Sequence, residues 1–240
     1  MIIKDIGFLA AFWGGFSSFF SPWQLCLMQI TPFFLAFAIG FYLLDDSKLQ
    51  TPNSRLTTLL MACAGYIPGF SIVFALMGTS GWGASSYILY NIDDFRIAAA
   101  IYLIIIALSM VIYNIYKNRI PHSAFLISCL PAGILLGASF ALAYSPCIPP
   151  VMSDIMNFAG KPANAHKGFH LLVVYGIGLT TAFAISGVII SIATGRFIQG
   201  KSGRNIVIYA SSAILLIMAF LLITDLMISY KSFLVGLVLD

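Results

Sequence analysis

The sequence predicts an all-α, multi-pass membrane protein, and its composition and charge pattern are the two observations behind that fold class. Of its 240 residues, 60% are hydrophobic and only 8% are charged, with a mean hydropathy of +1.00. Charged residues make up about a quarter of an average globular domain, so the composition excludes a soluble protein. The net charge of +4 is too small for a nucleic-acid partner, and the expected surroundings are a lipid bilayer.

The charged residues divide the chain into six apolar segments, each long enough to cross a membrane. A spanning helix needs about 20 apolar residues. The segments without Asp, Lys or Arg are 6–44, 56–92, 97–116, 120–153, 168–195 and 205–224. The third and sixth have the length of one helix, whereas the first and fourth are too long for one straight helix and contain interior prolines. The sequence therefore predicts six spans, of which the first and fourth are broken.

The basic residues predict how these spans are oriented. An even number of spans leaves both termini on one side of the membrane. The loops after the first, third and fifth spans hold seven Lys and Arg residues, and the other side holds five. Because basic residues are enriched in cytoplasmic loops, both termini are expected to be extracytoplasmic.

Two halves, about 1–118 and 119–240, form an internal repeat within a single membrane domain, 1–240. Five small or aromatic residues match at a constant offset of 109: Tyr66, Gly69, Phe74, Ala75 and Gly78 against Tyr175, Gly178, Phe183, Ala184 and Gly187. Three spans per half is an odd number, so the second half is expected to insert inverted, with a site near mid-membrane. Gly69 and Gly178 are candidates for close packing or for gating between the halves.

Prolines mark where the first and fourth spans are expected to break. Pro22 lies in the middle of 6–44, and Pro146, Pro149 and Pro150 interrupt 120–153. A proline removes a helical hydrogen bond and clashes with the preceding turn, and two consecutive prolines do not fit a regular helix interior. Irregular backbone at this depth is tolerated only against protein or a water-filled cavity, so a cavity is expected beside these breaks.

Cys147 lies within the second break, where a new half-helix is expected to begin. Ser145 is a candidate N-cap, and a proline suits the first helical turn. Free amides and the positive end of the helix dipole at that place favour a thiolate, which is the nucleophilic form of cysteine. A thiol with access to water is what disulfide exchange requires. Cys63 and Cys129, in plain apolar runs, are instead expected to fill space in the core.

The motif Tyr144-Ser145-Pro146-Cys147-Ile148-Pro149-Pro150 resembles the fourth-span motif of the CcdA family of cytochrome c biogenesis proteins, which corresponds to the central membrane domain of the DsbD reductases. Phe20-Ser21-Pro22 resembles the start of the family's other motif, Ser-Pro-Cys-x-x-Pro, in the first span. The resemblance covers nearly the whole chain. It implies a location in a bacterial-type cytoplasmic (inner) membrane, a fold of two inverted three-helix units, and one redox cysteine from each of spans 1 and 4.

The resemblance also implies a function, the transfer of reducing equivalents from cytoplasmic thioredoxin to an extracytoplasmic thioredoxin-like protein in cytochrome c maturation. Thioredoxin would open a disulfide from the inside, and the resulting dithiol would reduce the external partner. Because thiol exchange moves both electrons, neither a metal nor another cofactor is expected. The protein is then a thiol–disulfide oxidoreductase, provided that two of its cysteines form a working pair.

The first-span motif departs from the family at Trp23, which stands where the family has its cysteine, while Cys26 stands where the family has proline. Residues three apart share a helix face, so Cys26 could replace the missing cysteine from a displaced position. A disulfide with Cys147 requires Cα atoms less than about 7 Å apart. Alternatively, Trp23 plugs the cavity or stacks on a ligand.

Two polar residues follow the cysteines at helical spacing. Gln29 comes three residues after Cys26 and is a candidate for lining the same cavity. Asp154 comes seven residues after Cys147, two helical turns on. An acid within the membrane is a functional candidate, here as a proton acceptor for the thiol; the alternative is that Asp154 already lies at the membrane interface.

A soft-metal site is a weaker interpretation of the residues that follow. His166 and His170 are four residues apart, as are Met152 and Met156, and these side chains are ligands for ions such as copper. Methionines at helical spacing more often pack in a core, and the neighbouring Lys167 would repel a cation. No metal site is expected.

Two other functions remain open on the same fold. One is a transporter of a metal ion or a small thiol compound, with Trp23 in place of the redox cysteine. The other is a maturation factor that binds a partner protein without cycling its own thiols.

Overall fold

The structure of the chain is a computed structural model, and it describes residues 7–20, 25–44, 52–79, 83–116, 122–143, 150–198, 200–226, 229–230, 232–233 and 236. Across these ranges the secondary structure is helical and contains no strand, which confirms the all-α prediction. The helices are α1 (Phe8–Phe20), α2 (Leu25–Leu44), α3 (Pro52–Gly78), α4 (Gly83–Tyr90), α5 (Ile92–Tyr116), α6 (His122–Ala143), α7 (Pro150–Ala159), α8 (Ala165–Phe197) and α9 (Lys201–Ile223). A 3-10 turn at Pro162–Asn164 precedes α8.

The helices follow the apolar segments of the sequence. Segment 97–116, predicted as a single helix, lies within α5, and segment 205–224, also predicted as one helix, lies within α9 except for its last residue. Segment 6–44 contains two helices, α1 and α2, and segment 120–153 contains α6 and the first part of α7. Pro22, Pro146 and Pro149, where breaks are predicted, lie outside the described residues. Pro32, also in the first segment, lies inside α2.

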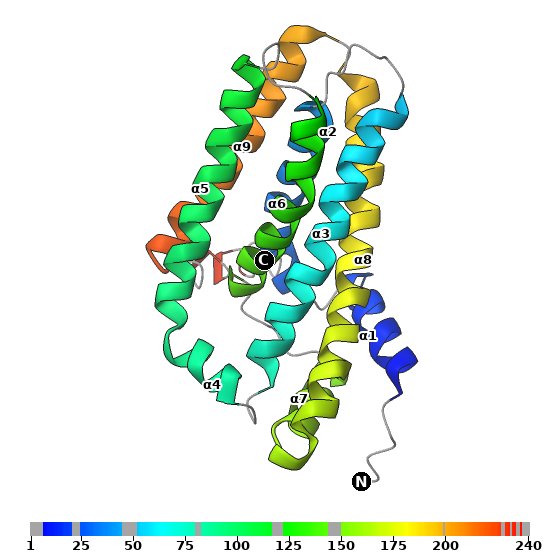
Figure 1. The fold of residues 1–240 in the computed structure, drawn as a ribbon, viewed down its shortest axis with the longest axis vertical. Coiled ribbons are helices and arrows are strands. Elements are labelled where there is room, and N and C mark those ends of the chain that lie inside the picture. The colour runs from blue at the N-terminus through cyan, green and yellow to red at the C-terminus, as the bar shows by residue number, and fades with distance from the viewer. Residues whose placement is uncertain are drawn as a thin grey trace.

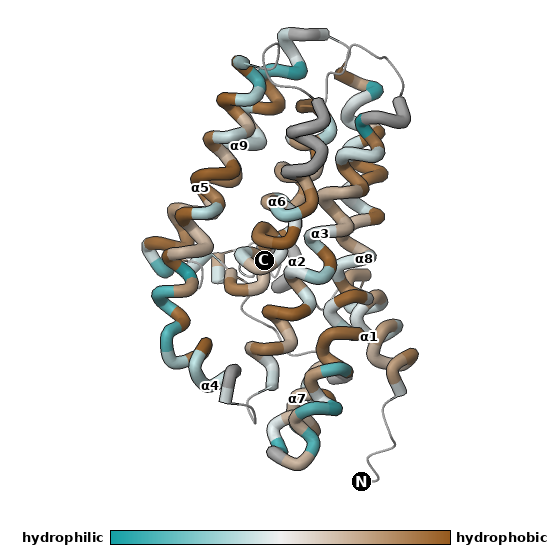
Figure 2. The backbone as a smooth tube through the Cα atoms, viewed as in Figure 1, coloured by the Kyte–Doolittle hydropathy of each residue, from teal (hydrophilic) through white to brown (hydrophobic). Residues whose placement is uncertain are grey.

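Four of the described helices are long and apolar enough to cross a membrane. They lie within α3, α5, α8 and α9, over Arg55–Gly78, Ile92–Tyr116, Ala165–Phe197 and Ser202–Ile223. Three further apolar stretches are shorter, at Phe8–Phe20, Ile30–Leu44 and Cys129–Ala143. Hydrophobic residues fill the middle of the molecule, and hydrophilic ones gather at its two ends (Figure 2). The chain is therefore a polytopic membrane protein.

The two halves of the chain pack against each other helix by helix. The most extensive contact joins α3 to α6, and further contacts join α1 to α8, α3 to α8, and α5 to α9. Each of these pairs takes one helix from each half, as the helix order in Figure 1 shows. The halves therefore share one core, with α3 and α8 side by side.

The helix ends separate into two groups at opposite ends of the molecule. The ends of α2, α5 and α8 and the starts of α3, α6 and α9 gather at the upper end in Figure 1. Helices α4 and α7 lie at the lower end. The helix ends that flank the three connections predicted to be cytoplasmic thus share one end of the molecule.

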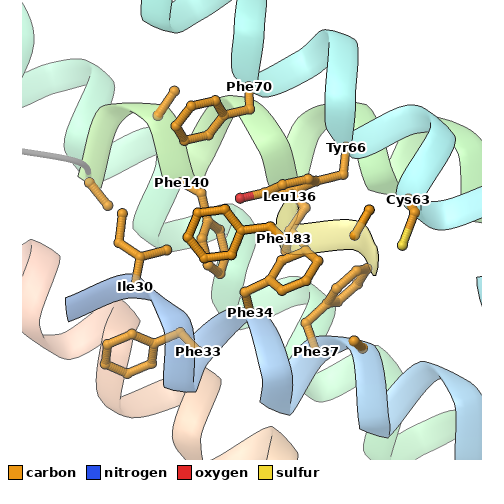
Figure 3. Close-up of a cluster of buried hydrophobic side chains, with 14 of the residues drawn as sticks. Ile30, Phe33, Phe34, Phe37, Cys63, Tyr66, Phe70, Leu136, Phe140 and Phe183 are labelled. Atoms are coloured by element: carbon orange, nitrogen blue, oxygen red, sulfur yellow. The ribbon is translucent and has the colours of Figure 1, made fainter. Parts of the chain in front are cut away.

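Aromatic side chains from α2, α3, α6 and α8 meet in the core (Figure 3). The ring centroids of Phe34 and Tyr66 are 4.8 Å apart, those of Phe34 and Phe183 are 5.5 Å apart, and those of Tyr66 and Phe140 are 5.9 Å apart. The planes are tilted or edge-to-face, the arrangements that aromatic quadrupoles favour. All four side chains are at most 2% exposed. Lipid is as apolar as these rings, so they hold the helices together by close packing rather than by exclusion of water.

Candidate functional site

The four cysteines of the chain occupy two kinds of position. Cys63 in α3 and Cys129 in α6 are buried within the hydrophobic core, 3% and 1% exposed. Both therefore fill apolar space, as the sequence predicts. Cys26 is the second residue of α2, and Cys147 stands in the sequence between α6 and α7.

Most residues of the two Ser-Pro motifs cannot be placed in the fold. Ser21, Pro22, Trp23, Ser145, Pro146, Cys147 and Pro149 lie outside the described residues. Cys26 and Gln29 lie in α2, and Pro150 is the first residue of α7. A proline at that position is favourable, because the first helical residues have no intrahelical partner for their amides. The pairing of Cys26 with Cys147 stays a prediction.

Helix α2 is fixed in the core by one buried face. Ile30, Phe34, Phe37 and Phe41 recur at spacings of three and four residues, and each is at most 5% exposed. This spacing places them along one side of an α-helix. Cys26 comes one helical turn before Ile30. The packing of this face therefore anchors α2 against the other helices of the core.

Tyr66 of α3 lies at the centre of this core. Its side chain is fully buried, and its hydroxyl has no hydrogen-bond partner in the described part of the chain. Phe34 and Phe140 flank the ring, and Phe70 follows one turn later with its centroid 6.0 Å away. The sequence identified Tyr66 only as a position in the predicted repeat. Whether its hydroxyl finds a hydrogen-bond partner depends on side chains from other helices, which the sequence does not reveal.

Tyr175, the residue matched to Tyr66 in the repeat, has a partner. Its hydroxyl lies 2.8 Å from Oγ of Ser18, and either oxygen can be the donor. The Ser18 hydroxyl also lies 2.6 Å from the carbonyl oxygen of Gly14, one turn earlier in α1. The Tyr175 ring stacks on Phe74 of α3 at 6.2 Å. This tyrosine therefore links α1, α3 and α8 with its polar atom satisfied.

The gating candidates Gly69 and Gly178 lie where two helices touch backbone to backbone. A Cβ added at Gly69 of α3 would overlap the carbonyl oxygen of Ile134 in α6 and lie 2.8 Å from its carbonyl carbon. A Cβ added at Gly178 of α8 would overlap the carbonyl oxygen of Phe12 in α1. Both glycines are buried. Each glycine is required for the close approach of its helix pair, and a role in gating stays a prediction.

Asp154 lies on the exposed side of α7. The buried residues of that helix are Met152, Ile155 and Ala159. This face packs on α8, because Ala159 lies so close to Gly168 that a Cβ added at Gly168 would overlap it. Asp154 itself is exposed. The carboxylate is therefore not enclosed in the protein interior.

The two histidines near the start of α8 are exposed, and their rings lie side by side. The ring centroids of His166 and His170 are 4.8 Å apart. Lys167, between them in sequence, places its Nζ 5.8 Å from the centroid of the Phe158 ring in α7. No group of three or more His, Cys or Asp side chains that could hold a metal occurs in the ranges that the structure describes.

One interhelical ion pair joins the ends of α5 and α9. Nη1 of Arg96 donates a hydrogen bond to Oδ1 of Asp225 at 3.1 Å and lies 3.9 Å from Oδ1 of Asp93. Asp225 follows α9 and has a φ of 54°, a left-handed conformation that aspartate tolerates better than most residues. The side chain of Asp225 is 65% exposed, so solvent weakens this pair.

Three curated proteins are similar to the chain over most of its length. A Haemophilus influenzae protein named for cytochrome c-type biogenesis is 26% identical over 225 residues, covering 89% of this chain and 93% of the relative. The cytochrome c-type biogenesis protein CcdA of Halalkalibacterium halodurans is 27% identical over 180 residues, 72% of each chain. The thiol:disulfide interchange protein DsbD of Ralstonia nicotianae is 20% identical over 173 residues, covering 68% of this chain and 27% of the relative.

Two other comparisons gave no match. No family model matches the sequence. No solved structure matches the fold.

Proposed function

We propose, from the membership of the CcdA family that these relatives support, that this chain carries reducing equivalents across a membrane by thiol–disulfide exchange. The electrons would come from cytoplasmic thioredoxin and pass to an extracytoplasmic thioredoxin-like protein. The membrane is then the cytoplasmic membrane of a bacterial-type cell. Cytochrome c maturation is the process in which the relatives are named.

The distribution of the cysteines is the observation that carries the proposal. Two of the four, Cys63 and Cys129, are sealed in the core, where a thiol is inert towards exchange. Disulfide chemistry in this chain therefore needs Cys26 and Cys147. Both stand beside the Ser-Pro motifs that resemble those of the family.

Cys26 is the candidate for the function of the cysteine that Trp23 replaces in the motif. It follows position 23 by three residues, and residues three apart in a helix share a face. In the structure it belongs to α2.

An inverted repeat of six spans is the architecture that we propose for this chemistry, in one domain covering 1–240. The two helix crossings support it, because Gly69 of α3 meets Ile134 of α6 in the way that Gly178 of α8 meets Phe12 of α1. In such repeats discontinuous helices form a site near mid-membrane. Here these helices are the α1–α2 and α6–α7 pairs. The helix ends that flank the three predicted cytoplasmic loops gather at one end of the molecule (Figure 1), which supports placing these loops on one side of the membrane.

The relay consists of two balanced exchanges. A thioredoxin thiolate attacks one sulfur of a Cys26–Cys147 disulfide, so that one S–S bond forms and one breaks. The second thioredoxin thiol resolves the mixed disulfide, which leaves oxidised thioredoxin and a Cys26–Cys147 dithiol. The dithiol then reduces a disulfide of the external protein by the same two steps, and two electrons and two protons have moved. Ser21, Pro22, Gln29, Ser145, Pro146 and Pro149 would shape the cavity.

Single cysteine variants in proteoliposomes test this function. Thioredoxin, its reductase and NADPH are placed on one side of the membrane, and an oxidised thioredoxin-like acceptor on the other. We expect acceptor reduction to be lost in Cys26→Ser and in Cys147→Ser. Cys63→Ala and Cys129→Ala are the matched controls and should retain it, because their thiols are buried in the hydrophobic core.

A different pattern would point to another function. If Cys26→Ser reduces the acceptor as fast as the wild type, the proposed pair is wrong. Trp23 in the motif position is the observation that favours transport of a metal ion or a small thiol compound. In that case Trp23→Cys would abolish function in cells, whereas Cys26→Ser would not.

A further inference from the structure

Two short helices at the lower end of the molecule, α4 and α7, differ in the chemistry of their exposed faces (Figure 1). Tyr87, Leu89 and Tyr90 of α4 are 66%, 42% and 89% exposed. The exposed side chains of α7 include Asp154 and Asn157. A polar face suits water, whereas large apolar side chains exposed together mark contact with a membrane or another protein. The face of Tyr87, Leu89 and Tyr90, here called the α4 face, therefore needs a partner.

The α4 face continues into the lipid-facing surface of α5. The Tyr87 ring contacts Phe95, in the first turn of α5, edge to face with the ring centroids 6.5 Å apart. Beyond Phe95, α5 exposes an apolar stripe that includes Ile97, Ile101 and Ile105, each about half exposed. Because α5 is long and apolar enough to cross a membrane, this stripe lies against lipid. The partner of the stripe is thus the nearest candidate for the partner of α4.

Charges at the start of α5 indicate the level of α4 in the bilayer. Asp93 and Asp94 are exposed in the first turn of α5, and Arg96 pairs with Asp225, which follows α9, at 3.1 Å. Charged side chains are costly in the hydrocarbon core, so its edge lies near this pair on both helices. Helix α4 ends at Tyr90, just before these charges, and turns away from the direction of α5 (Figure 1). It therefore lies beyond the hydrocarbon.

We infer that α4 lies in the headgroup layer of the bilayer and that this lipid surface covers the α4 face. Tyrosine is enriched at membrane interfaces, because its ring is apolar and its hydroxyl can hydrogen-bond to water or to lipid headgroups. Leu89 adds apolar surface, as in other helices that lie in the interface. The lipid contact holds the start of α5 at a fixed depth. The inference depends on the membrane location of the chain and not on thiol exchange.

Fluorescence quenching in phosphatidylcholine liposomes tests this placement. The four native cysteines are replaced by alanine or serine, and a bimane label is attached to Tyr87→Cys or Tyr90→Cys. We expect both labels to lose more fluorescence to a nitroxide on the lipid headgroup than to a nitroxide deep in the acyl chain or to iodide in water. If Tyr87→Cys does not fold, Tyr90→Cys decides, because a side chain 89% exposed can be replaced without loss of packing.

Two further positions in the same background are the matched controls. Ile105→Cys, on the apolar stripe near the middle of α5, should be quenched most by the deep nitroxide. Asn157→Cys, on the exposed face of α7, should be quenched most by iodide. The two controls identify hydrocarbon and water on the same molecule, so the labels on α4 are read against both.

Each other result for the α4 labels overturns the inference. Quenching mainly by iodide would place α4 in water, and quenching mainly by the deep nitroxide would place it in the hydrocarbon. Protection from all three quenchers would mean that protein, such as a second copy of the chain, covers the α4 face. Because the native thiols are absent from this background, none of these results bears on whether Cys26 and Cys147 carry electrons.

Discussion

Gly69→Ala tests the backbone contact between α3 and α6, the most extensive helix pair in the fold. The added methyl group would overlap the carbonyl oxygen of Ile134 and lie 2.8 Å from its carbonyl carbon and its Cα. All three atoms belong to the backbone, so no flexible side chain can move aside. Real Cβ contacts essentially never come below 3.0 Å, so α6 has to shift away from α3.

The expected cost of this shift follows from the size of the overlap. Forcing one extra carbon into a well-packed contact costs about 1–3 kcal/mol. For a chain of this length, each kcal/mol corresponds to about 2–4 °C in the midpoint of thermal unfolding. We therefore expect Gly69→Ala to lower the midpoint by several degrees.

The buried thiols supply the assay. Cys63 and Cys129 lie in the two helices concerned and are 3% and 1% exposed. A maleimide dye that fluoresces on reaction will label them only when the helices separate, provided that Cys26 and Cys147 are replaced by serine to remove the background. The dye signal against temperature then gives the midpoint of unfolding in detergent.

Gly83→Ala, in the first turn of α4, is the control for Gly69→Ala, because no atom lies within 4 Å of the added methyl group. It should leave the midpoint unchanged. If the midpoints of Gly69→Ala and Gly83→Ala are equal, the backbone contact between α3 and α6 does not carry the stability assigned to it.

Three further predictions concern contacts elsewhere in the core and at its edge. Gly178→Ala should lower the midpoint as Gly69→Ala does, and a neutral effect would show that the two crossings are not equivalent. Tyr175→Phe should cost about 0.5–1.5 kcal/mol, the net value of the lost bond to Ser18; a gain in the midpoint would contradict that bond. Arg96→Ala should cost no more than about 1 kcal/mol, because Asp225 is mostly exposed. This small decrease in stability should become smaller as salt is added in the same assay. A large decrease that does not depend on salt concentration would contradict an ion pair that solvent screens.

Helix positions were the most predictable part of the fold, because they depend on local composition. The charge-free segment 168–195 corresponds closely to α8, at Ala165–Phe197. At 33 residues, α8 is about 50 Å long, longer than the roughly 30 Å of a hydrocarbon core. Its ends therefore extend past the apolar segment into residues such as Lys167 and Arg196, which can reach water.

The predicted repeat can be compared with the helix contacts. The matches Tyr66 with Tyr175 and Gly69 with Gly178 fall at equivalent crossings in space. The alignment of Phe20-Ser21-Pro22 with Tyr144-Ser145-Pro146 implies an offset of 124 between α1 and α6, whereas the glycine contacts of Gly15 and Gly137 imply 122. The two offsets differ because the motif alignment matches residue types, whereas the glycine contacts match positions where two helices pack closely.

The lack of a hydrogen-bond partner for the Tyr66 hydroxyl in the described residues could not be predicted from the sequence. Whether a buried tyrosine is satisfied depends on what the facing helix presents, here Ser18 at one crossing and Phe140 at the other. Register between helices from different halves decides this, and no local pattern encodes it.

The most direct test of the central claim is a map of the thiols under non-reducing conditions in native membranes. The free and disulfide-bonded cysteines are identified in peptides before and after thioredoxin, its reductase and NADPH are added. A disulfide between Cys26 and Cys147 that opens under these conditions, with Cys63 and Cys129 free throughout, is the expected result. If Cys26 and Cys147 both remain free thiols under oxidising conditions, the chain does not carry electrons through this pair.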